Sequence, residues 1–175
     1  KGVAFSRDAA IVVGTVTGSV AFDDGAIDGG IDAGPDTDLL VARFDADGTV
    51  AWHTTVEADV SLAGAEIAAH GDGVVFGGAP TTGLVLGQAD GSSAHLDEDP
   101  GGSTWIVSYA DDGTVRWAST IAGTVDAQID EVAIVGDRAY LDVVIRGDEN
   151  VLPGTDESVV AARKDGSVWA IDLPT

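Results

Sequence analysis

Pro35-Asp-Thr-Asp-Leu-Leu-Val-Ala-Arg-Phe-Asp-Ala-Asp-Gly-Thr-Val-Ala-Trp52 is one of three related segments in this chain. The second copy spans residues 100–117, and a more divergent third spans residues 153–169. In each copy a proline lies thirteen residues before the glycine of an Asp-Gly pair, and a tryptophan follows shortly afterwards. The pairs are Asp47-Gly48, Asp112-Gly113 and Asp165-Gly166. Similar segments at intervals of this size predict an array of structural repeats.

The sequence around each copy predicts four short strands and no helix. Asp-Gly between two apolar runs is typical of a hairpin turn, because glycine readily adopts the positive φ that the turn requires. We find no helical stripe of useful length. The expected strands are 3–7, 10–17, 38–44 and 49–57 in the first unit, 65–69, 74–79, 103–109 and 114–121 in the second, and 129–135, 139–145, 158–163 and 167–173 in the third. Long loops are expected between the second and third strands of the first two units, with each proline just before a strand.

The unit resembles the bacterial β-propeller repeat family. The resemblance rests on Gly2-Val3-Ala4, on Val12-Val13-Gly14-Thr15, and on the run from Asp38 through Asp47-Gly48 to Trp52. It covers essentially the whole chain, although Ser103 replaces the Asp in the second copy and Trp169 is displaced by one position in the third. A more distant likeness is to the quinoprotein type of propeller repeat. The resemblance implies a fold and frequent export or surface display, but no activity.

We therefore expect an all-β chain of three four-stranded antiparallel blades of a β-propeller. The expected blades are 2–59, 63–123 and 127–175, within one segment that spans residues 1–175. Three blades do not close a ring, since propellers have four to eight. Both flat ends of the stack are then expected to expose apolar faces. Three explanations remain open: missing blades on flanking sequence or another subunit, two copies closing a six-bladed ring head to tail, or a small β fold of another kind.

The chain is strongly acidic, with 30 Asp and Glu against 8 Lys and Arg and a net charge of -22. Such a charge repels phosphate, so nucleic-acid binding is excluded, and an anionic membrane surface is disfavoured. No apolar run is long enough to span a bilayer, so membrane insertion is not expected. The charge suits solubility, a high-salt habitat, or the attraction of cations or a basic partner. Cysteine is absent, which excludes disulfides and thiolate chemistry.

Most of the acidic residues fall in the long loops and inter-blade connections, which share one face of a propeller. Calcium is the cation best suited to oxygen-rich, glycine-containing loops. The candidate ligands are Asp23, Asp24, Asp28 and Asp32 in the first loop, and Asp97 and Asp99 in the second. The first group lacks the spacing and the terminal Glu of an EF-hand loop, and the second is the weaker candidate. The competing interpretation is a solvated acidic loop. Asp45-Ala46-Asp47-Gly48 also looks like part of a calcium loop, but the persistent Asp-Gly is what a turn requires.

Nothing in the sequence identifies a catalytic constellation, and no catalytic residue or cofactor other than calcium is suggested. The three histidines occupy different repeat positions, and Trp52, Trp117 and Trp169 are expected to pack between blades. The preferred interpretation is a non-enzymatic scaffold or interaction module of an exported, periplasmic or surface-displayed bacterial protein. Its acidic loop face would contact cations or a partner. The alternative is a segment of a propeller enzyme, quinoprotein-like or a hydrolase, whose site is completed by missing blades.

Overall fold

The computed structural model describes residues 2–6, 8–22, 31–58, 65–81, 83–96, 103–121, 126–146, 158–163 and 166–173. Its described part is all-β and its paired strands are antiparallel, as the sequence predicts. The strands are β1 (Gly2–Ser6), β2 (Ala9–Val20), β3 (Ile31–Phe44), β4 (Val50–Glu57), β5 (Glu66–His70), β6 (Gly73–Thr81), β7 (Leu84–Gly87), β8 (Ser93–Leu96), β9 (Ser103–Ala110), β10 (Val115–Ile121), β11 (Asp126–Val135), β12 (Arg138–Arg146), β13 (Ser158–Arg163) and β14 (Gly166–Asp172). No helix in the described ranges is long and apolar enough to cross a membrane.

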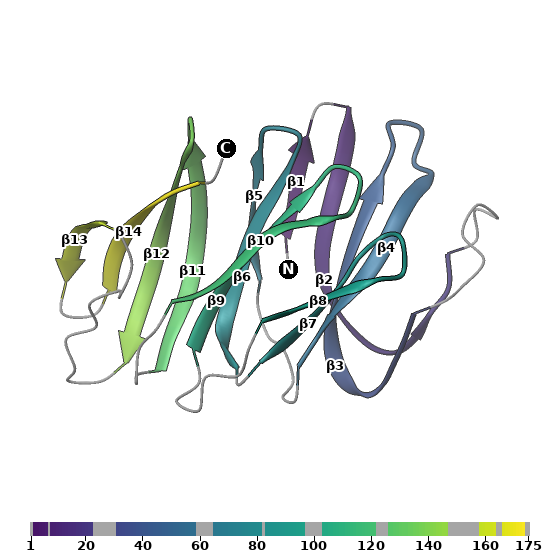
Figure 1. Cartoon of the computed structure of the whole chain (residues 1–175), viewed down its shortest axis with the longest axis horizontal. Coiled ribbons are helices and arrows are strands. Elements are labelled where there is room, and N and C mark those ends of the chain that lie inside the picture. Colours follow the sequence, from purple (N-terminus) through teal and green to yellow (C-terminus); the bar gives the residue numbers. More distant parts are fainter. Residues whose placement is uncertain are drawn as a thin grey trace.

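The strands form three sheets that lie side by side along the long axis of the molecule (Figure 1). We call them sheet A, with the order β1-β2-β3-β4-β7-β8, sheet B, with β10-β9-β6-β5, and sheet C, with β11-β12-β14-β13. Sheet B lies between the other two. The sheets are not closed into a ring.

Three details of the strand predictions were wrong. The expected loop between the second and third strands of the second unit contains β7 and β8, and this hairpin extends sheet A to six strands. In sheet C, β14 rather than β13 pairs with β12. The third correction concerns Pro35, which lies inside β3. It falls between the pairs Thr17–Thr37 and Ser19–Asp32, where the register shifts, so its missing N–H removes no ladder hydrogen bond.

Two apolar layers hold the three sheets together. The first lies between sheets A and B and contains Ile11, Val41 and Trp52 on one side and Phe76 and Tyr109 on the other. The second lies between sheets B and C. Side chains alternate across a strand, so successive residues of sheet B enter different layers: Phe76 faces sheet A and Val75 faces sheet C. Sheet B is thus buried on both faces.

The tryptophans contribute to both layers. Trp52 lies between sheets A and B, and Trp117 packs against the layer between sheets B and C, which confirms the expected positions of these two side chains. Trp105 is 1% exposed and belongs to the core, with its ring edge-on to Phe76. The side chain of Trp169 lies outside the described part of the structure.

Candidate functional site

Most of the predicted calcium ligands lie outside the part of the chain that the structure describes. Asp23, Asp24, Asp28, Asp97 and Asp99 lie outside the described residues. The backbone of Asp32 pairs with Ser19 at the far end of the β2–β3 hairpin, and its side chain is not described. The calcium hypothesis therefore stays a prediction. Within the described ranges, no three His, Asp or Glu side chains are grouped in a way that could hold a metal ion.

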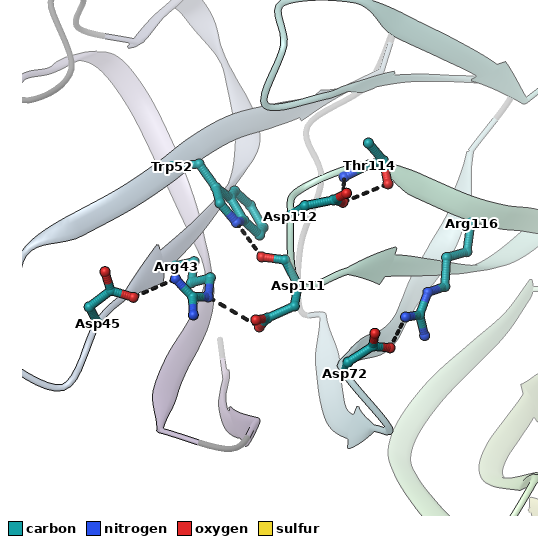
Figure 2. A network of polar contacts seen from close by, with 8 residues as sticks. All are labelled: Arg43, Asp45, Trp52, Asp72, Asp111, Asp112, Thr114 and Arg116. Atoms are coloured by element: carbon teal, nitrogen blue, oxygen red, sulfur yellow. Dashed lines mark hydrogen bonds and ion pairs between the residues drawn. The ribbon is translucent and has the colours of Figure 1, made fainter.

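The most developed polar arrangement in the described chain joins sheet A to the β9–β10 turn of sheet B (Figure 2). The Arg43 guanidinium lies between two carboxylates: its Nε donates to Asp111 over 3.1 Å, and its second bond goes to Asp45. The Arg43 side chain is only 15% exposed. Burial opposes its charge, but the hydrogen bond to Asp111 and the nearby carboxylates outweigh this and raise the pKa of Arg43.

Trp52 holds the same turn by a second contact. Its indole Nε1 donates to the Asp111 carbonyl oxygen over 2.8 Å. The ring also lies close to Gly113, where an added Cβ would approach the indole to 2.9 Å. Gly113 has φ of 82°, so glycine is required here for both its backbone conformation and its lack of a side chain.

The Asp-Gly turns of the first two units share one hydrogen-bonding pattern, whereas Asp165 of the third lies outside the described residues. Asp112 Oδ1 accepts from the backbone N–H of Thr114 over 3.0 Å and from its hydroxyl over 2.7 Å (Figure 2). Asp47 makes the equivalent bonds to Thr49. These bonds lower the pKa of both aspartates. The carboxylates of Asp47 and Asp112 therefore make hydrogen bonds within their turns, which is the role that the sequence predicts for the persistent Asp.

A third turn of this kind was missed from the sequence. Asp90 accepts from the N–H and hydroxyl of Ser92, and Gly91 has φ of 82°. The bond from the Ser92 hydroxyl is the main reason that the pKa of Asp90 is lowered. Asp90-Gly91-Ser92 between Leu84–Gly87 and Ser93–Leu96 is the same signature that defines the repeats, so it could have predicted the β7–β8 hairpin.

The β7–β8 hairpin brings sheet A onto the β9–β10 turn. The Ala89 N–H donates to Gly113 O over 3.1 Å, and the Val115 N–H donates to the Gln88 side-chain oxygen over 2.8 Å. The buried Tyr109 hydroxyl donates to Gly87 O over 2.8 Å, and burial raises the pKa of this phenol. These bonds use polar atoms to join two sheets, which is a structural role.

The outer face of sheet A, turned away from sheet B, is the second candidate site. Val3 is 52% exposed and Phe5 is 74% exposed. Their cross-strand neighbours are Val12 and Ala10, so these four side chains share one face. We call this group the outer patch. It is an exposed apolar surface on a chain whose charge is otherwise very high.

The repeat shows what lies over the same positions in the other sheets. Counted back from the hairpin turn, Val3 and Phe5 correspond to Ile67 and Ala69 of β5 and to Val132 and Ile134 of β11. Ile67 and Ala69 pack into the layer with sheet A, and Val132 and Ile134 pack into the layer with sheet B. In both sheets the preceding sheet covers these positions. In sheet A they are open.

The far half of the same face is covered by the chain's own Phe22, which follows β2. Its ring stacks on His53 at 4.8 Å and meets Phe44 edge-on at 6.4 Å. Phe44 corresponds to Tyr109 in the second unit, and Tyr109 stacks on Trp52 of the preceding sheet. Phe22 therefore fills, over sheet A, the place that a tryptophan of a neighbouring sheet fills over sheet B.

The opposite end of the stack differs, which corrects the expectation of two apolar end faces. Val135 and Val168 are exposed on the outer side of sheet C. They are mixed with charged side chains on β11, β12 and β14, namely Asp130, Glu131, Arg138, Asp142 and Asp172. Arg138 and Asp172 form an exposed ion pair at 2.6 Å that lowers the pKa of Asp172. Among the described side chains, only those of sheet A form an apolar end face.

No protein-family model matches the chain, and no match was found among the curated proteins.

Proposed function

We propose that this chain is a non-enzymatic scaffold and interaction module made of propeller-type blades, and that its interaction surface is the outer face of sheet A. The observation that carries the proposal is the exposure of Val3 and Phe5 at positions that are covered in sheets B and C. A patch of this kind on a highly charged chain is typical of a surface that another protein element covers.

The repeated pattern supports propeller-type blades. Sheet B has the four-stranded meander expected of a blade, and the hairpins of the first two units have the same turn chemistry. The stack is also directional. Val41 of sheet A and its equivalent Ile106 of sheet B both point toward the following sheet. A further sheet placed before sheet A would continue this order, and the open end of the stack suits such a sheet.

We include a role for the strong negative charge of the chain in the same proposal. A net charge of -22 favours cations or a basic partner around the acidic loops and keeps the molecule soluble while one apolar face is exposed. Export or surface display on a bacterial cell is what the resemblance to the propeller repeat implies, and we include it in the proposal.

A chain lengthened by one unit tests the proposal. A second copy of residues 1–64 placed before Lys1 repeats the natural connection between sheets A and B. Because the natural chain has no cysteine, Phe5→Cys in the original unit is the only thiol in the protein. We expect the added sheet to cover this thiol and slow its alkylation by at least about tenfold relative to Phe5→Cys in the unlengthened chain.

The control is Val135→Cys on the outer side of sheet C, where Val135 is 68% exposed. Its alkylation rate should be the same in the two chains, since the added unit lies at the other end of the stack. Equal alkylation of Phe5→Cys with and without the added unit would contradict the proposal.

A further inference from the structure

We propose that Phe22 is an autoinhibitory contact: it takes the place of an aromatic side chain of a preceding sheet, and such a sheet docks on sheet A only after Phe22 has moved away. The inference rests on the proposed function, because it concerns the regulation of docking on the same face. It also states what the incoming sheet must supply at this place, namely an aromatic side chain like the one that Trp52 supplies to sheet B.

The residues of sheet A that pack with Phe22 have direct equivalents in sheet B. They are Leu40, which belongs to the same apolar cluster, and Phe44 and His53, which meet the ring. Counted from the glycine of each Asp-Gly turn, their equivalents are Trp105, Tyr109 and Ala118. All three equivalents pack in or against the apolar layer between sheets A and B. Phe22 therefore lies on the surface that a neighbouring sheet covers in the second unit.

The aromatic contacts show that Phe22 and a preceding sheet compete for one place. Tyr109 stacks on Trp52 of the preceding sheet at 6.4 Å, and its equivalent Phe44 meets Phe22 at the same distance. Interfaces between sheets are closely packed and leave no room for a second ring. A sheet that brought a tryptophan to Phe44 would have to displace Phe22. The apparent affinity for that sheet is then reduced by the fraction of molecules in which Phe22 is in place.

The chain bends just before Phe22. Gly18 has φ of 74°, and the pairing of β2 with β3 shifts register between Thr17 and Ser19. At the same place in the second unit, the connection between β6 and β9 forms the β7–β8 hairpin, which pairs with β4 of the preceding sheet. Sheet A has no sheet before it in the described stack, and the corresponding connection covers its own sheet instead (Figure 1).

The test uses the lengthened chain with Phe5→Cys in the original unit, because alkylation of this thiol reports whether the added sheet is docked. We expect Phe22→Ala in the original unit to slow the alkylation by a further factor of about five or more, because it removes the competing ring. Phe22→Tyr keeps a ring at this place and should leave the rate unchanged. In the chain of natural length, Phe22→Ala should not change the rate, since Phe5 is already 74% exposed while Phe22 is in place.

Val135→Ala in the lengthened chain is the matched control, because it removes an exposed apolar side chain from the opposite end of the stack. It should leave the protection of Phe5→Cys unchanged. Protection that is equal with and without Phe22→Ala, or weaker with it, would overturn the inference while the proposed function stands. An added unit that protects the thiol in neither case would contradict the proposed function itself, so the two failures are distinguishable.

Discussion

Three aspartates show how a single side chain can determine a turn in this protein. Asp47, Asp90 and Asp112 each accept two hydrogen bonds from the Thr or Ser two positions later, and a glycine with positive φ follows each aspartate. In each turn the carboxylate accepts a hydrogen bond from a backbone N–H that has no partner within the strand ladder. The bonds favour the ionised form, which is why the pKa of each aspartate is lowered.

The Asp112 turn should stabilise the fold in a pH-dependent way. A carboxylate whose pKa is lowered on folding contributes stability above its ordinary pKa, and the contribution is lost as the pH falls through its folded value. We expect Asp112→Ala to lower the melting temperature at pH 6, and the difference from the natural chain to shrink below about pH 4. Asp112→Asn keeps an acceptor oxygen and should melt between the two at pH 6. A difference that persists unchanged to pH 2.5 would contradict the role of the charge.

Arg43 is the residue whose loss should most weaken the junction of sheets A and B. Its replacement by Ala leaves Asp111 partly buried without its charged partner. We expect the free energy of unfolding to fall by about 1–3 kcal/mol, measured by chemical denaturation. Arg138→Ala, which removes an exposed ion pair with Asp172 and a side-chain contact with Tyr140, should change stability little. Equal effects of the two substitutions would show that the Arg43 bonds add nothing beyond a surface ion pair.

Among the strands, β7 and β8 show how an element can leave the unit in which it occurs in the sequence. Both lie between β6 and β9 of sheet B, yet β7 pairs with β4 at the edge of sheet A through Val56–Leu86 and Glu57–Val85. Leu84 and Leu86 enter the layer between the two sheets. The β7–β8 hairpin therefore connects two neighbouring repeats: it follows β6 of sheet B in the sequence and pairs with β4 of sheet A.

Close approach between strands places a limit on side-chain size at Gly77 of β6. An added Cβ would lie 2.6 Å from both the Trp105 carbonyl oxygen and the Ile129 side chain. We expect Gly77→Ala to reduce the free energy of unfolding by about 1–3 kcal/mol, measured by denaturant titration, because the Trp105 backbone of the neighbouring strand β9 must shift and the Ile129 side chain of sheet C must move away.

Gly14→Ala in β2 is the matched control for this prediction. Nothing lies within 4 Å of a Cβ added at Gly14, and the substitution should be neutral or slightly stabilising. If Gly14→Ala destabilised the protein as much as Gly77→Ala, the loss at Gly77 would be due to strand propensity and not to its close contacts.

For the molecule as a whole, charge and apolar burial act in opposite directions. Two continuous apolar layers favour a compact stack, whereas a net charge of -22 favours expansion. The ion pairs seen among the described residues join three arginines to four aspartates. The balance between these forces should depend on ionic strength.

Added salt should raise the melting temperature of the natural chain, because screening weakens the repulsion among carboxylates. Calorimetric scans from low salt to molar NaCl test this prediction. Sodium acetate at the same ionic strength should have a similar effect over the dilute range, where screening dominates. A melting temperature that does not change up to molar salt would show that self-repulsion is not a main stress on the fold.

The sequence alone determined the all-β class and most of the strands. Asp-Gly turns and alternating apolar residues depend on local backbone conformation and on the pleat, and both can be read within ten residues. The sequence also predicted that Trp52 and Trp117 lie between sheets. The β7–β8 hairpin was within reach through Asp90-Gly91-Ser92, but its partner strand was not.

Only the tertiary structure decided which strands pair and which faces remain open. The pairing of β14 with β12 and of β7 with β4 depends on contacts between residues far apart in the chain, and periodicity does not encode these contacts. The candidate site follows the same rule. Val3 and Phe5 read as ordinary strand residues, and their significance comes from the neighbouring sheet that covers their equivalents and leaves them exposed. Exposure is a property of the assembled stack, so the sequence could predict an open end but not which end would be apolar.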